Sequence, residues 1–261
     1  MGSRQRLRRL RPRTHPRRHH GRLRRRELTS ARRPGVNGAD VSPQPHAERH
    51  HDRGLIHLDR PPADGALAQT LKSRRSTKVF RPDHIDSGVL SRLLATTIST
   101  GSSRSRPYGS AHGRYDVLVT VVTAAVQGLP PAAYRYLPDE HALLRCSEQG
   151  DHRATLAYAT LDAAWLTQCP VALILSADLA AANRAFDTQQ AGRGERFCWL
   201  EAGLLTQNVY LWAADNGLGT VFLGGLDPAK TQAATASWLP SSHSVLGVLP
   251  IGHSVGPAST P

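Results

Sequence analysis

Cysteine and long apolar runs are scarce in this 261-residue sequence, and each scarcity excludes a class of protein. The three cysteines, Cys146, Cys169 and Cys198, are odd in number and widely spaced, so they indicate neither a disulfide framework nor a zinc site. No apolar stretch reaches the roughly 18–20 residues of a membrane helix, and no apolar signal segment follows the basic start. We therefore expect a cytoplasmic protein that does not span a membrane.

Positive charge is concentrated near the N-terminus. The chain has 33 basic and 20 acidic side chains, a formal net charge of +13. Residues 1–54 contain 16 basic and 4 acidic side chains, whereas residues 55–261 contain 17 and 16. Because nucleic-acid-binding domains place Lys and Arg on a folded face, the nearly neutral second segment argues against such a domain there.

Residues 1–54 are predicted to be a disordered, arginine-rich tail, because so few apolar side chains cannot bury enough surface to offset the chain entropy. Three interpretations stay open: an arm that binds RNA or DNA, an organellar transit peptide, or a non-native extension from a start codon assigned too far upstream. Only 3 of the 33 basic residues are Lys, which indicates GC-rich coding and favours the third. Residues 55–261 are predicted to form the folded domain.

Apolar periodicity predicts an irregular mixture of helices and strands in this domain. Helices are expected over 66–72, 86–97, 151–168 and 195–216, and strands over 116–123, 132–137, 171–176, 220–223 and 245–251. The elements do not alternate as in a parallel βαβ fold. The pattern favours an α+β fold, with helices packed on one mostly antiparallel central sheet.

The helix expected over 195–216 is apolar almost all round, with Phe197, Trp199, Leu200 and Leu204 among its side chains. A helix of this kind is expected to be buried on every side. It would then lie at the centre of the domain or in a subunit interface. Gly217 follows it, as a glycine often follows the end of a helix.

Motifs of hydrolases and nucleotide-binding proteins are absent: the sequence has no GxxxxGK[ST], HExxH or GxSxG. Gly217-Leu218-Gly219 follows a helix and precedes a strand, the reverse of the order that dinucleotide binding needs. His50, His51 and His57 are interpreted as solvated loop histidines. No catalytic residue and no metal ligand is therefore predicted.

The segment 74–80, RRSTKVF, is compact and basic. Guanidinium groups bind phosphate in bidentate geometry, but this segment alone is more simply a basic surface turn. Together with five further segments in matching order, it resembles the FMN-dependent nitroreductase superfamily, in its SagB-type branch, which includes thiazole/oxazole dehydrogenases. Those segments are PYGSAHGRY (107–115), GLPPAAYRY (128–136), RFCWLEAG followed by QN (196–208), GLGTVFLGG (217–225) and LPIG (249–252).

The resemblance implies an α+β homodimer with FMN at the subunit interface. Hydride would pass from NAD(P)H through FMN to a small-molecule acceptor such as a quinone or nitro compound. The side chains of the basic segment, from Arg74 to Lys78, would hold the phosphate and the ribityl chain of FMN, and Lys78 would also reach the flavin ring. The backbone at Gly224 and Gly225 could approach that ring, because no side chain intervenes. The residues that the resemblance assigns to FMN are Arg74, Arg75, Ser76, Lys78, Ser110, Gly224, Gly225 and His253.

Five positions depart from the family pattern. His253 replaces an Arg on the phosphate, Asp116 a Pro, and Leu204 a His, while Gln189-Gln190 replaces the Lys-Tyr pair of the dehydrogenases. The missing Lys-Tyr pair argues against azoline dehydrogenation. The neutral imidazole of His253 favours an alternative function, a flavin-binding protein that sequesters FMN with little turnover.

Overall fold

The computed structural model describes residues 56–62, 64–101 and 105–255. The predicted disorder of residues 1–54 lies outside this part of the chain, with the three interpretations of that segment, and so do His50 and His51. The chain divides into two compact units, Met1–Asp59 and Arg60–Pro261. Almost all described residues belong to the second unit, and the following account is confined to it.

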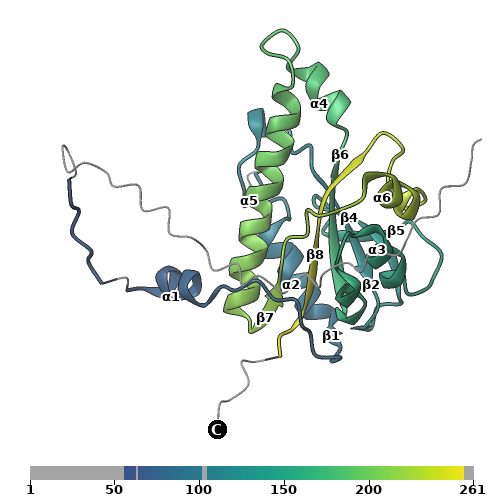
Figure 1. Ribbon diagram of the computed structural model, residues 1–261, viewed down its shortest axis with the longest axis horizontal. Helices are drawn as coiled ribbons and strands as arrows, with labels where there is room; N and C mark the ends of the chain where they lie inside the picture. Colours follow the sequence, from purple (N-terminus) through teal and green to yellow (C-terminus); the bar gives the residue numbers. More distant parts are fainter. Residues whose placement is uncertain (1–55, 63, 102–104, 256–261) are drawn as a thin grey trace, which may run out of the picture. The chain divides into compact units, whose positions relative to one another are not determined.

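Six strands form one antiparallel sheet in the order β5-β4-β2-β6-β8-β7 (Figure 1). They are β2 (Leu118–Thr123), β4 (Ala132–Leu137), β5 (Ala142–Arg145), β6 (Val171–Ala177), β7 (Leu218–Thr220) and β8 (Ser244–His253). Two short strands, β1 (Ile85–Asp86) and β3 (Val126–Gln127), pair separately in parallel. The predicted α+β class with a mostly antiparallel sheet is confirmed.

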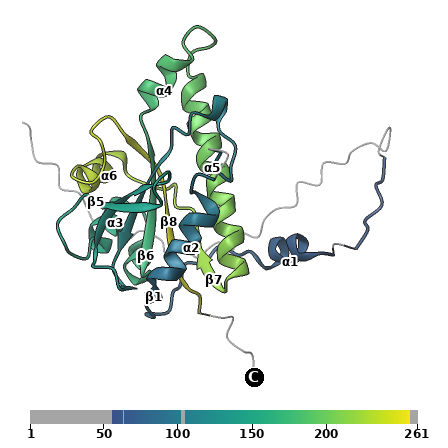
Figure 2. The ribbon, with the colours of Figure 1, turned by 180° about the vertical axis from the view of Figure 1, so that it is seen from behind.

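Helices cover both faces of the sheet (Figures 1 and 2). On one face lie α2 (Ser87–Thr97) and α5 (Arg193–Asp215), and on the other α3 (Arg153–Ala159) and α6 (Pro228–Thr235). Because neighbouring strand residues point to opposite faces, Leu173 packs in the core with α2 and α5, and Ile174 packs in the core with α3. Two further helices, α1 (Ala66–Ser73) and α4 (Leu179–Ala185), contact α5.

The single helix predicted over 151–168 is wrong. The segment instead forms α3 and a separate 3-10 helix, Ala164–Gln168. Between them Thr160 is extended, with φ −86° and ψ 161°, and its hydroxyl donates to Ala157 O and accepts from Ala163 N. Thr160 also forms a β-bridge with Leu226, so a long-range contact stabilises the break. The bounds of the strand predicted over 220–223 are also wrong: β7 begins at Leu218 and ends at Thr220.

The helix predicted over 195–216 exists as α5, but it is not buried on every side. One face packs in the core, whereas Trp199, Leu200 and Leu204 on another face are 45%, 62% and 49% exposed. Their spacing of one, four and five residues places them on one stripe of the helix. Among the described residues, no helix has the length and apolar character needed to cross a membrane.

Candidate functional site

The basic segment lies along the edge of the sheet. After α1, Thr77 N donates to Thr220 O at 2.9 Å, and Ser76 forms a parallel bridge with Thr220 of β7. This close approach requires Gly219, because a Cβ at that position would lie 2.6 Å from the Thr77 side chain. The edge strand β7 therefore fixes the path of residues 74–78.

Tyr210 of α5 connects this segment to the chain beyond β7. The Arg74 guanidinium lies over the Tyr210 ring, 5.1 Å from its centroid. The Tyr210 hydroxyl accepts from Phe222 N at 2.8 Å and lies 3.3 Å from Ser76 Oγ. Sequence analysis missed Tyr210, whose only signal was a phenol in an otherwise apolar part of the helix.

The cations of this segment are not neutralised by acids. Arg75 donates to the carbonyl oxygens of Lys72 and Arg74. Within the part of the chain that the structure describes, Arg74, Arg75 and Lys78 form no ion pair, whereas nearby Arg81 pairs with an aspartate, Asp83, at 2.6 Å. Three positive charges are therefore left at the β7 edge, an arrangement that suits a phosphate-bearing ligand.

His253 lies next to β7, at the same edge of the sheet. It is the last residue of β8 and pairs with Leu218 of β7, and its carbonyl accepts from Arg81 N at 2.9 Å. Its imidazole is half-buried. The structure therefore brings His253 to the sheet edge that carries the basic segment, as the sequence comparison implied.

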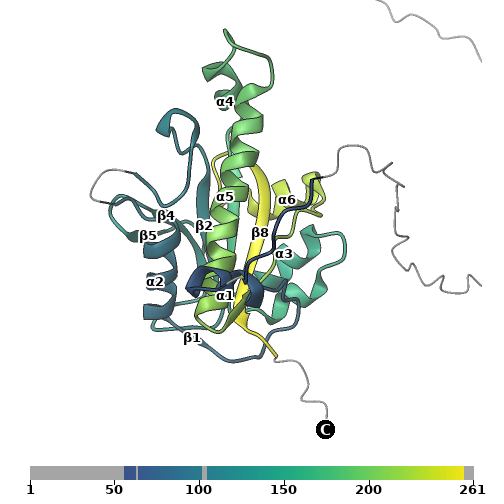
Figure 3. The same ribbon diagram turned by 90° about the vertical axis from the view of Figure 1, so that its left-hand side faces the viewer.

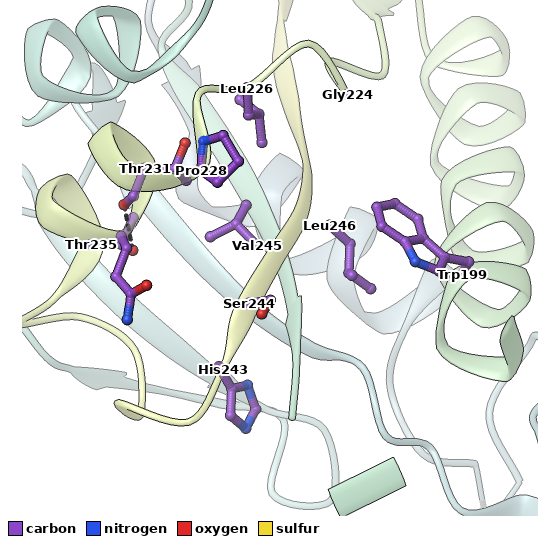
Figure 4. Close-up of a pocket in the computed structure, with 11 residues that line it drawn as sticks. Trp199, Gly224, Leu226, Pro228, Thr231, Thr235, His243, Ser244, Val245 and Leu246 are labelled. Atoms are coloured by element: carbon purple, nitrogen blue, oxygen red, sulfur yellow. Dashed lines mark hydrogen bonds between the residues drawn. The ribbon is translucent and has the colours of Figure 1, made fainter. Parts of the chain in front are cut away.

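Gly224 and Gly225 follow β7 in an exposed loop. A Cβ at Gly224 would meet only the Phe222 ring, at 3.2 Å, and one at Gly225 would lie 3.9 Å from Leu161. The protein itself thus leaves this backbone uncovered. Gly224 also lines a cavity of about 260 Å³ between β8, α6 and the exposed Trp199 (Figure 4).

His243 lines the far part of the same cavity (Figure 4). Its Nδ1 lies 3.2 Å from Ser176 Oγ of β6. Burial lowers the pKa of His243, which favours a neutral imidazole near pH 7. The cavity is therefore lined by a neutral polar group, an indole and the backbone of Gly224.

Ser110 does not join the other predicted residues within one chain. Its hydroxyl donates to Glu201 Oε2 at 2.5 Å and accepts from Tyr115 N, while Glu201 Oε1 accepts from Val117 N at 2.9 Å. Glu201 is only 3% exposed, and burial raises its pKa, partly offset by the bonds from Ser110 and Val117. Glu201 precedes Tyr210 by nine residues, about 13 Å along the helix. Sequence analysis did not assign Glu201 a role.

The departures from the family pattern have local partners. Asp116 forms a two-bond ion pair with Arg114, at 2.8 and 3.0 Å. Gln190 Oε1, between α4 and α5, accepts from Arg196. Leu204 lies on the exposed stripe of α5.

Comparison with known proteins decides the family. The model of the nitroreductase family matches residues 71–253, which includes the basic segment, α5, β7 and β8. This chain belongs to the nitroreductase family.

Three relatives of this nitroreductase-family chain carry the name "putative nitroreductase". The Methanocaldococcus jannaschii protein is 30% identical over 160 residues, 60% of this chain and 78% of its own length. The Ralstonia eutropha structure is 24% identical with a TM-score of 0.60, over 78% of this chain and 89% of that one. The Anabaena variabilis structure is 22% identical with a TM-score of 0.62, over 72% of this chain. This chain spans only 38% of the Anabaena protein.

The fold also matches a chain of the Escherichia coli microcin synthetase McbBCD complex with truncated pro-MccB17 bound. That match has 18% identity and a TM-score of 0.60, and it covers 83% of this chain and 84% of the other. At this identity the likeness concerns the fold alone.

Proposed function

We propose that this protein is an FMN-dependent oxidoreductase that passes hydride from NAD(P)H through bound FMN to a small-molecule acceptor such as a quinone or nitro compound. Membership of the nitroreductase family supports flavin-dependent oxidoreduction in general. The observation that carries the proposal is the β7 edge, where Arg74, Arg75 and Lys78 have no acidic partner among the described residues and Arg74 lies over the Tyr210 ring.

The residues at this edge fit the two ends of FMN. The forks of Arg74 and Arg75, with the Ser76 hydroxyl, match a terminal phosphate. The uncovered backbone at Gly224 and Gly225 can approach a planar ring where a side chain would intervene. Bound FMN would supply the redox chemistry, and this chain's residues would bind it, orient it and set the charge around it.

We also propose that the protein is a homodimer. Trp199, Leu200 and Leu204 form an exposed apolar stripe on α5, and such stripes on folded chains are usually covered by a partner. The resemblance assigns Ser110 to FMN from a separate loop, but within this chain its hydroxyl already donates to Glu201 and accepts from Tyr115 N. The test is light scattering on the wild type, Leu200→Glu and a control, Leu144→Glu, whose leucine is 53% exposed on β5. We expect dimers for the wild type and the control and monomers for Leu200→Glu; a monomeric wild type would contradict the proposal.

Placement in the SagB-type branch is a narrower proposal. It is supported by the six sequence segments. Gln189 and Gln190, where the dehydrogenases carry Lys-Tyr, argue that azoline dehydrogenation is not the reaction.

We also propose a cytoplasmic location, with which the free thiols of Cys146, Cys169 and Cys198 agree.

The alternative is a protein that holds FMN with little turnover. It is favoured by one observation, the imidazole of His253 at a position where the family has a guanidinium. The two functions differ in whether bound flavin is reduced by NAD(P)H.

An absorbance spectrum of the purified full-length protein, repeated anaerobically after NADPH or NADH is added, tests both functions. We expect flavin bands that bleach on addition of the nicotinamide. Bands that stay oxidised would support the sequestering function. The absence of flavin bands after reconstitution with FMN would refute both.

A further inference from the structure

A row of hydrogen-bonded side chains links α2 to the β4–β5 hairpin, and Figure 3 shows α2 next to these two strands. Ser91 Oγ of α2 is 2.9 Å from His141 Nε2, and His141 Nδ1 is 2.7 Å from Tyr136 Oη of β4. None of these residues belongs to the proposed flavin site. The order hydroxyl, imidazole, orienting group is the arrangement that activates a nucleophile.

Both ring nitrogens of His141 take part in this row, so the tautomer of His141 sets the direction of its hydrogen bonds. In the tautomer that is protonated at Nδ1, His141 donates to Tyr136 Oη, and Nε2 is left unprotonated to accept the Ser91 proton. The proposed reaction uses this tautomer.

A cavity of about 270 Å³ opens beside Ser91. Its walls are mainly aliphatic, and no Lys, Arg, Asp or Glu lines it. Ser87 lines the same cavity one helical turn before Ser91, so its hydroxyl is placed on the same face of α2 as a further donor. The aliphatic lining residues are Leu90, Leu94, Leu129 and Leu143. The cavity therefore suits a short, uncharged apolar group.

His141 is held in an uncommon backbone conformation, with φ +47°. Residues other than glycine adopt this left-handed region only at a cost of about 1 kcal/mol or more. Its ring nitrogens hydrogen-bond to Ser91 and to Tyr136 in that conformation. Strain of this kind at a polar cluster motivates a functional hypothesis.

We propose that Ser91 is the nucleophile of a second, redox-independent site that acts on small uncharged esters. The Ser91 oxygen would attack the ester carbonyl while His141 Nε2 takes the Ser91 proton. The alcohol would leave with that proton, and the acyl group would stay on Ser91 in the apolar cavity. Water, giving its proton to His141, would then release the acid and restore Ser91. The balance is ester plus water to acid plus alcohol.

The chain offers a matched control. Ser147 Oγ is also 2.9 Å from a histidine, His152 Nε2. However, the Ser147 hydroxyl donates to the Glu148 carbonyl at 2.7 Å, so its proton is already committed. Ser147 has a histidine at the same distance, but a carbonyl already accepts its proton and it does not line the cavity beside Ser91. We therefore expect Ser147 to be unreactive.

The experiment treats the full-length protein with p-nitrophenyl butyrate and with a fluorophosphonate probe. Serine–phosphorus bond formation expels fluoride, and mass spectrometry locates the adduct. We expect labelling at Ser91 that is lost in Ser91→Ala and kept in Ser147→Ala. His141→Asn, which tolerates the left-handed backbone, should slow labelling about 100-fold.

Absence of a Ser91 adduct, or equal labelling of the wild type and Ser91→Ala, would overturn this proposal. The reaction should proceed at the same rate in FMN-loaded and FMN-free protein. A failure here would therefore leave the proposed flavin function standing, and a failure of flavin binding would leave this site standing.

Discussion

The two halves of α5 are built in opposite ways. In the N-terminal half, Glu201 is enclosed and both of its oxygens accept hydrogen bonds, from Ser110 and Val117. In the C-terminal half, Tyr210 lies below Arg74, beside cations without acidic partners and the uncovered backbone of the glycine loop. One helix thus carries a cluster whose polar groups pair within the chain and a cluster whose cations have no acidic partner among the described residues.

Because of this difference, mutations in the Glu201 cluster should lower folding stability, whereas mutations in the Tyr210 cluster should lower ligand affinity. Loss of a partner from the Glu201 cluster leaves a buried group unpaired, which costs folding free energy. Loss of a cation from the Tyr210 cluster removes a group that has no acidic partner, so the effect should appear in ligand affinity. The following predictions test this separation, from the largest effect to the smallest.

Glu201→Ala should lower the free energy of unfolding by about 3 kcal/mol, because it removes a buried side chain and leaves the Ser110 hydroxyl and Val117 N–H without an acceptor. Chemical denaturation measures this effect. The control is Glu195→Ala, six residues earlier on α5, whose carboxylate has only a 3.4 Å contact with Trp199. Equal losses in both variants would remove the distinction between the two halves.

Arg74→Ala should weaken FMN binding about 30-fold, since a charge-assisted contact with phosphate is worth about 2 kcal/mol. Fluorescence titration measures the affinity, and denaturation should show little change in stability. The matched control is Arg92→Ala, which removes an exposed arginine of α2 and should bind FMN as the wild type does. Unchanged flavin occupancy in Arg74→Ala would refute the site assignment.

Tyr210→Phe should lower the free energy of unfolding by about 1 kcal/mol, because Phe222 N–H loses its acceptor while the ring below Arg74 is kept. Tyr158→Phe, with a 70% exposed ring, should have no effect. A cost for Tyr210→Phe as large as that for Glu201→Ala would show that the C-terminal half of α5 is equally structural.

His253→Arg should tighten FMN binding about threefold, because it adds one partly exposed charge at the β7 edge. His84→Arg, at an exposed position, provides the control. No gain in affinity would place His253 away from the phosphate and would mean that the alignment of the last strand is wrong.

The smallest expected effect is a pH dependence. The raised pKa of Glu201 means that the folded state binds its proton more tightly than the unfolded state does. The resulting stabilisation is present below the ordinary carboxyl pKa and is lost as pH rises through the raised value. The stability advantage of the wild type over Glu201→Gln should therefore shrink as pH rises above about 4, the ordinary pKa of a carboxyl group. An advantage that grows with pH would contradict this sign.

Local pattern predicted the parts of the fold that depend on neighbours in sequence. The run Val171–Ala177 is apolar at every position until its end and forms the central strand β6, and Asp86 caps α2 through Gly88 N. The break at Thr160 was missed, because its bridge to Leu226 joins residues far apart in the chain.

The candidate site divides in the same way. Sequence motifs identified the basic segment and the paired glycines, whose chemistry is visible in the residues themselves. Tyr210 and Glu201 were not given roles, because their partners are far away in the sequence. Ser76 is 134 residues from Tyr210, and Ser110 is 91 residues from Glu201. Only the folded chain shows that these two side chains organise opposite halves of α5.

The most direct test of the ligand-binding half of α5 compares FMN with riboflavin, which lacks the phosphate, in the wild type and in Arg74→Ala. We predict that the wild type binds FMN at least about tenfold more tightly than riboflavin. Arg74→Ala should reduce the ratio of FMN affinity to riboflavin affinity and should leave the riboflavin affinity itself unchanged. Equal affinity of the wild type for the two flavins would contradict the claim that the β7 edge holds a phosphate.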